Sequence, residues 1–189
     1  MIPGDKTPGR YAAKSKLSAA VLALVAIGAG APAIYQQFLH EKEDTRLVAY
    51  QDGKRIWTIC GGLTRIYNRP VVKSDRLTAD ECKRLDGEVQ AEGLREMAKL
   101  IKPEIWATLS PAARAGVASF CWHNLGPEKC RPSTFLKYMN QNRRNDACGE
   151  ITRWIFDNNQ DCRIQSSNCG GQVIRRMQED ELCLVGVLP

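Results

Sequence analysis

The chain has 189 residues, of which 43% are hydrophobic and 25% are charged, so it can form a packed core, and general disorder is excluded. The length suits one domain of ordinary size, with or without a terminal extension. The formal net charge of +6 is shared between residues 1–16 and residues 40–189, and this density is too low for a nucleic-acid-binding face. We therefore expect no nucleic-acid partner.

The N-terminal part of the chain has the charge pattern of an export signal. Residues 1–16 form a basic leader, and residues 17–39, LSAAVLALVAIGAGAPAIYQQFL, contain no charged side chain. A helix of this length would span about 34 Å, which is enough to cross the hydrocarbon core of a bilayer. The basic leader on one side and the acidic run from Glu41 on the other predict an N-terminus in the cytoplasm.

Residues 17–39 are nevertheless a weak anchor by composition, because Ala and Gly dominate the segment and Pro32 lies inside it. Three interpretations remain open. The segment can be a signal anchor that leaves the bilayer, a signal peptide cleaved near Ala31-Pro32-Ala33, or a helix of the folded core. The first two place residues 40–189 outside the cytoplasm, and we favour the signal anchor.

The soluble part begins with a predicted β-hairpin and a long helix. Residues 46–59 contain the turn dipeptide Asp52-Gly53 between two segments that are typical of strands. Thr78 and Glu81 match a capping box, which predicts a helix that begins there and extends to about residue 100.

The remainder of the chain is predicted to be helical, apart from one long loop. Ser110-Pro111 is typical of a helix start, and the pattern continues to Leu125 before a glycine. Further helices are predicted over residues 133–139, 146–156 and 172–183, with a loop over residues 157–171. The fold class is therefore α+β: a mainly helical domain with a small β-hairpin near its start, preceded by a hydrophobic helix.

Eight cysteines all lie after residue 59, at positions 60, 82, 121, 130, 148, 162, 169 and 183. None of them forms a C-x-x-C motif and the chain has only two histidines, so a metal site is disfavoured. Disulfides formed in an oxidising compartment account better for an even number of cysteines, and this agrees with export.

Two carboxylates and a hydroxyl form the best candidate catalytic group. Glu43 is expected at the end of the first helix of the soluble part, Asp52 on the hairpin turn, and Thr58 on the second strand. Hydrolysis of an acetal at neutral pH needs one acid to protonate the leaving oxygen and one anion to activate water or stabilise the developing cation. The spacing Glu43-x8-Asp52-x5-Thr58 can bring these roles to one place.

This spacing resembles the phage-type lysozymes of glycoside hydrolase family 24, which use a Glu, eight residues, an Asp, five residues and a Thr. Three further segments are similar to that family: Leu47 to Asp52, Trp57 to Thr64, and Arg175-Arg176 with Glu179. The resemblance covers residues 40–185. With its N-terminal segment, the whole chain is similar to a signal-anchor-release endolysin of the kind made by lambdoid phages.

The resemblance implies a lysozyme-like domain over residues 40–189 that hydrolyses the β-1,4 bond between N-acetylmuramic acid and N-acetylglucosamine. Glu43 would be the general acid, Asp52 the base or electrostatic partner, and Thr58 would help to place the water. The partners would be peptidoglycan glycan strands and, through residues 17–39, the bacterial inner membrane, with release to the periplasm and lysis of the host cell. We expect a monomer without cofactor or metal.

One position departs from the family pattern. The family usually has Gly-His-Thr where this chain has Gly62-Leu63-Thr64, and Leu63 can neither titrate nor form a side-chain hydrogen bond. Guided by the resemblance, we expect these disulfides: Cys60–Cys82, Cys121–Cys130, Cys148–Cys183 and Cys162–Cys169.

Other residues and functions remain open at this point. His123 is interpreted as a partly buried helix residue without a ligand role, and Arg175 and Arg176 as surface charges or contacts for peptidoglycan carboxylates. A lytic transglycosylase, which needs a catalytic Glu but no Asp partner, is one alternative. A non-enzymatic, membrane-anchored lysis or binding protein with a disulfide-stapled outer domain is another.

Overall fold

The computed structural model describes residues 15–53, 55–157 and 159–186, so most of the predicted leader lies outside the described residues. The helices are α1 (Ala19–Ala26), α2 (Ala31–His40), α3 (Ala79–Leu100), α4 (Pro103–Thr108), α5 (Pro111–Ala118), α6 (Pro127–Cys130), α7 (Thr134–Asn140), α8 (Arg144–Ile151) and α9 (Gly170–Leu184). A π-helix, η2 (Ser119–Leu125), directly follows α5, and a 3-10 turn, η3 (Gln165–Ser167), precedes α9.

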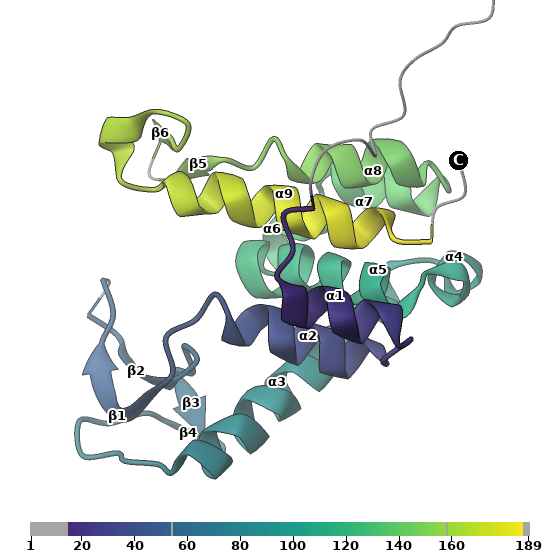
Figure 1. Cartoon of the computed structure of the whole chain (residues 1–189). Helices are drawn as coiled ribbons and strands as arrows, with labels where there is room; N and C mark the ends of the chain where they lie inside the picture. Colours follow the sequence, from purple (N-terminus) through teal and green to yellow (C-terminus); the bar gives the residue numbers. More distant parts are fainter. Residues whose placement is uncertain (1–14, 54, 158, 187–189) are drawn as a thin grey trace, which may run out of the picture.

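Short antiparallel hairpins make up the β-structure of the described residues. They pair β1 (Arg46–Gln51) with β2 (Trp57–Cys60), β3 (Arg65–Ile66) with β4 (Arg69–Pro70), and β5 (Phe156–Asp157) with β6 (Gln160–Asp161). The first two hairpins lie at one end of α3, and α3 leads from them into the helical part of the molecule (Figure 1). This arrangement confirms a mainly helical α+β fold.

Two hydrophobic cores support these two parts. The larger core contains buried residues of α1, α2, α5, α7, α8 and α9, whereas the smaller one lies between the hairpins and the start of α3. Ile59 on β2 and Leu85 on α3 belong to the smaller core, together with the Cys60–Cys82 disulfide. The helix α3 also contributes Met97 to the larger core, so it connects both cores and fixes the position of the hairpins relative to the helices.

Residues 17–39 form two helices rather than the single hydrophobic helix that their composition predicts. The chain turns between α1 and α2 at Gly28, which has a φ of 70°, and Pro32 lies in the first turn of α2. Apolar side chains of this segment are buried in the larger core, namely Leu17 before α1 and Val21, Ile34, Tyr35, Phe38 and Leu39 within the two helices. In this folded form the segment is therefore part of the core of the domain.

Among the residues that the structure describes, no helix combines the length and the apolar character needed to cross a membrane.

Several predicted elements are confirmed, with changed boundaries. The hairpin over residues 46–59 and the capping box of Thr78 and Glu81 are both present. The helix predicted to continue to Leu125 changes at Ser119 from α-helix to π-helix, and the one predicted over residues 146–156 ends at Ile151. The predicted loop over residues 157–171 contains the β5–β6 hairpin and η3.

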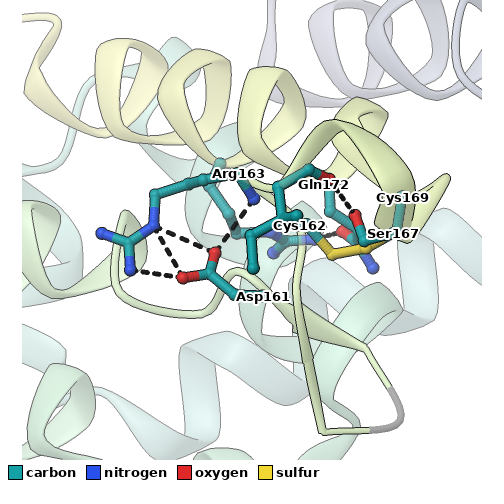
Figure 2. Close-up of a disulfide and its surroundings, with 8 residues drawn as sticks. Asp161, Cys162, Arg163, Ser167, Cys169 and Gln172 are labelled. Atoms are coloured by element: carbon teal, nitrogen blue, oxygen red, sulfur yellow. Dashed lines mark hydrogen bonds and ion pairs between the residues drawn. A yellow bond between two sulfur atoms is a disulfide. The ribbon is translucent and has the colours of Figure 1, made fainter.

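All four expected disulfides are formed. Figure 2 shows the Cys162–Cys169 bond closing the loop before α9, beside the ion pair of Asp161 and Arg163. Cys169 is the residue that precedes α9, and Cys183 near its other end is bonded to Cys148 of α8. Both ends of α9 are thus covalently held, which matters because this helix carries residues of the candidate site.

The crossing of α5 and α9 depends on Gly116. A Cβ atom at this position would lie 2.7 Å from Leu182 Cβ and 3.0 Å from both the backbone nitrogen of Cys183 and the carbonyl oxygen of Glu179. These neighbours belong to a helix held by disulfides at both ends, so they cannot move aside easily.

We predict that Gly116→Ala lowers the free energy of unfolding by about 1–3 kcal/mol, because the added methyl group overpacks this crossing. Gly171→Ala, in the first turn of α9 with no atom within 4 Å of the added Cβ, should stay within about 1 kcal/mol of wild type. Urea denaturation of the oxidised proteins measures both values. Equal stability of the two variants would contradict this account of the α5–α9 contact.

Candidate active site

Glu43 lies just beyond the end of α2, at the edge of a cleft. Its backbone N–H donates to the carbonyl oxygen of Leu39 (2.9 Å), which continues the helical turn by a few residues. Its side-chain Oε1 accepts from Arg175 Nη1 at 2.9 Å and lies 3.2 Å from His123 Nε2. The Glu43 side chain is 29% exposed, so it is held by the protein and still reaches solvent.

Arg175 is in turn fixed by a buried charge network on α9. Its Nε lies 3.4 Å from Oε1 of Glu179, a carboxylate with no exposed surface. Glu179 also accepts from Ser119 Oγ at 2.6 Å and pairs with Arg176 Nη1 at 2.6 Å. The interpretation of Arg175 and Arg176 as surface charges is therefore wrong, because their side chains are only 14% and 2% exposed.

The charge state of Glu43 follows from two opposing effects. Burial acts to raise the pKa of Glu43, but the hydrogen bonds from His123 and Arg175 and the positive charge beside it lower that pKa to about 2. Glu43 is thus an ionised carboxylate at neutral pH in this form of the protein. Burial raises the pKa of Glu179, the carboxylate behind Arg175.

Asp52 lies at the turn of the β1–β2 hairpin and Thr58 on its second strand, and each contacts Ile56. Asp52 directly follows β1, and its Oδ1 accepts from the backbone N–H of Ile56 at 2.8 Å. Thr58 on β2 is 3% exposed, and its Oγ1 donates to the carbonyl oxygen of Ile56 at 3.0 Å. The two candidate residues therefore share Ile56 as a neighbour, while the Oε1 contacts of Glu43 are with His123 and Arg175.

A cleft of about 600 Å³ opens beside Glu43 and His123. Its wall includes Gln36 and Gln37 from α2, Gly61 and Leu63 from the turn after β2, and Asp86 and Gln90 from α3. The volume is in the range of ligand-binding clefts. Leu63 thus gives an apolar wall where the family has its histidine, and burial raises the pKa of Asp86 on the opposite helix.

His123 and Arg175 are the site residues that the sequence did not identify. They lie 80 and 132 residues away from Glu43 in the chain. The only signal for Arg175 was the likeness of its helix to the C-terminal helix of the lysozyme family, and nothing in the local pattern marked His123 as a partner of an acid.

Comparison with known proteins decides the family. The sequence profile of the phage lysozyme family matches residues 40–179. The chain belongs to the phage lysozyme family. A SAR-endolysin of Escherichia phage 933W is 47% identical over 171 residues, which cover 90% of this chain and 94% of that protein. Membership of this family makes the protein a glycoside hydrolase of the lysozyme type.

Solved structures show the same fold at low sequence identity. The endolysin from Escherichia coli O157:H7 phage FAHEc1 has a TM-score of 0.63 and 22% identity, covering 82% of this chain and 93% of that one. The active form of P1 phage endolysin Lyz has a TM-score of 0.65 and 17% identity, covering 93% of this lysozyme and 98% of that chain.

We predict that Glu43 makes the stability of this lysozyme sensitive to acid. Its pKa is about 2 in the folded protein, below the ordinary value of 4.5, so its ionised form stabilises the fold above about pH 4.5. This contribution is lost as the pH falls toward 2. The free energy of unfolding should therefore decline less steeply between about pH 5 and pH 2 in Glu43→Gln than in wild type. Denaturant titrations across this range test the expectation, and equal slopes would contradict it.

Proposed function

We propose that this lysozyme is a phage endolysin that hydrolyses the β-1,4 bond between N-acetylmuramic acid and N-acetylglucosamine, with Glu43 as the general acid. The observation that carries the proposal is the placement of Glu43, which is clamped through one oxygen at the edge of a cleft large enough for sugar rings. The match of the chain to phage lysozymes supports peptidoglycan as the substrate.

General acid catalysis requires a proton on Glu43 when the glycosidic bond breaks. In the open cleft this carboxyl is ionised, because the two donors outweigh the effect of burial. A glycan strand that fills the cleft removes the remaining water, and desolvation of a carboxylate raises its pKa. Proton uptake on glycan binding thus prepares Glu43 to protonate the leaving oxygen.

Asp52 and Thr58 are assigned the complementary roles. Asp52 acts as the base or as the anion that stabilises the developing positive charge, as the second carboxylate of a glycosidase does. Thr58 helps to place the water: its hydroxyl proton is directed to Ile56, so its lone pairs can accept from a water molecule. The shared contact with Ile56 supports the pairing of these two residues.

We predict that Glu43→Gln in the full chain lowers lytic activity by about 10²-fold or more, because the amide cannot donate a proton to the leaving oxygen. Asp52→Asn should also cause a large loss. The matched control is Asp44→Asn, which removes the neighbouring carboxylate, whose side chain is 84% exposed, and should retain activity.

Turbidity loss of cells stripped of their outer membrane measures these activities, and mass spectrometry of the released fragments identifies the reaction. Reducing N-acetylmuramic acid ends are expected. Near wild-type lysis by Glu43→Gln would overturn the assignment of the acid, and 1,6-anhydro ends would indicate a lytic transglycosylase instead.

The proposal extends to the N-terminal segment. Residues 17–39 first insert into the inner membrane as a signal anchor and are then released, so that the domain over residues 40–189 acts in the periplasm. Two observations support this order. The segment contributes buried residues to the larger core as α1 and α2, and Glu43 follows α2 directly. While the segment lies in the bilayer, the core is incomplete and Glu43 cannot reach its donors. The name of the phage 933W relative, SAR-endolysin, agrees with such a release.

We predict that a more hydrophobic segment keeps the enzyme inactive at the membrane. Ala20, Ala23 and Ala26 are exposed in the folded form, so replacing all three by Leu raises membrane affinity without disturbing buried contacts. Membrane fractionation during expression should show the leucine variant retained and lysis delayed. The control replaces the same three residues by Gln and should be released. Lysis by the leucine variant at the wild-type time would exclude the release step.

A further inference from the structure

His123 is held in place by its neighbours on the π-helix η2. Trp122 packs against α3 at Gly93, where an added Cβ would lie 2.4 Å from its ring. Asn124 Nδ2 donates to the carbonyl oxygen of Ser119 at 2.7 Å and to Glu179 Oε1 at 3.0 Å. Cys121 is bonded to Cys130. The imidazole is therefore presented to Glu43 by a backbone that is fixed on both sides.

The π-helix itself explains how the imidazole reaches the cleft. A π-turn contains more residues than an α-turn and shifts the direction of the side chains that follow, and such turns are frequent at functional sites. The helix that begins at Pro111 changes to this form at Ser119, and His123 and Asn124 then point to two different carboxylates, Glu43 and Glu179.

Both donors of Glu43 use the same oxygen. Arg175 Nη1 and His123 Nε2 both contact Oε1, and no hydrogen bond to Oε2 occurs within residues 15–53, 55–157 and 159–186. A carboxyl group fixed through one oxygen has a defined plane, which leaves the second oxygen to carry the proton toward a ligand in the cleft.

We propose that His123 is a positioning residue of the muramidase reaction, whose Nε2–H holds Oε1 of Glu43 together with Arg175 and so leaves Oε2 as the proton-donating atom. The inference rests on the proposed function, because it concerns the geometry of the acid. His123 also links the acid to η2, and thus to the buried Glu179 network.

The groups that act electrostatically on Glu43 come from several elements. They are Tyr35 on α2, Asp86 on α3, His123 on η2 and Arg175 on α9, while Glu179 acts on Tyr35 and His40 acts on Asp86. Loss of the His123 hydrogen bond removes one cause of the low pKa of Glu43 and leaves burial unchanged, so that pKa must rise. Activity that requires protonated Glu43 should then extend to higher pH.

The test compares His123→Leu with His123→Gln in the full-length protein. Gln can place an amide N–H where Nε2 lies, whereas Leu cannot donate. On a soluble peptidoglycan fragment, His123→Leu should lower kcat about tenfold at the wild-type optimum while KM changes by less than about twofold. In His123→Leu, the fall of kcat on the alkaline side of the pH profile should move to higher pH by about one unit. His123→Gln should restore both kcat and the pH profile to near wild type.

A polar-to-leucine change at an exposed position that directly follows α7, Gln141→Leu, is the control for substitution itself and should leave kcat and the pH profile unchanged. Thermal unfolding checks that each variant is folded. The inference would be overturned if His123→Leu had wild-type kcat and an unshifted pH profile. It would also be overturned if His123→Gln folded but did not restore kcat. If Glu43→Gln were active in the same assay, the proposed function itself would fail, so the two outcomes are distinguishable.

Discussion

The buried carboxylate of Glu179 organises the active side of this molecule. It accepts hydrogen bonds from Ser119 and Asn124, which define the π-helix, and it pairs with Arg175 and Arg176 on its own helix. A charged group without exposed surface is tolerated only when it is paired and hydrogen-bonded. The contacts of Glu179 therefore fix the positions of the side chains that make them. Through Arg175 the same network extends to Glu43. Glu43, the proposed general acid, is thus positioned by residues of η2 and α9.

The N-terminal segment completes this arrangement from the other side. Tyr35 on α2 is fully buried and lies within the electrostatic influence of Arg175, Glu179 and Glu43. Residues 17–39 fold here into two short helices, whose large side chains Val21, Ile34, Tyr35 and Phe38 are buried. Gly28 provides the turn between them, since a φ of 70° suits glycine.

Local signals explain which parts of the fold could be predicted. The Asp52-Gly53 turn and the Thr78–Glu81 capping box each act within a few residues, and both elements were placed correctly. The break between α1 and α2 was missed because the apolar run looks continuous until the packing against α3 and α5 is known. The change from α5 to η2 was missed for the same kind of reason: the π-turn is stabilised by distant partners such as Glu179 and Gly93.

For the candidate site too, local sequence predicts some features and not others. The positions of Glu43, Asp52 and Thr58 on a helix end, a turn and a strand follow from a short stretch of sequence. Their environment does not, because the groups that set the charge of Glu43 approach from η2 and α9. The likeness to lysozymes named the acid, whereas only tertiary structure shows what keeps it ionised in the open cleft.

The network also determines how readily Glu43 can accept the proton that its proposed role as general acid requires. If Arg175 had Glu43 as its sole partner, protonation would leave a mostly buried cation unpaired, at a cost of several kcal/mol. Arg175 Nε instead lies 3.4 Å from Glu179 Oε1 as well, and therefore keeps a hydrogen-bond acceptor when Glu43 becomes neutral. Protonation of Glu43 then weakens one contact of Arg175 and leaves the other in place. On the proposed assignment of Glu43 as the general acid, the buried Glu179 is thus what allows an ionised carboxylate held by Arg175 to take up a proton.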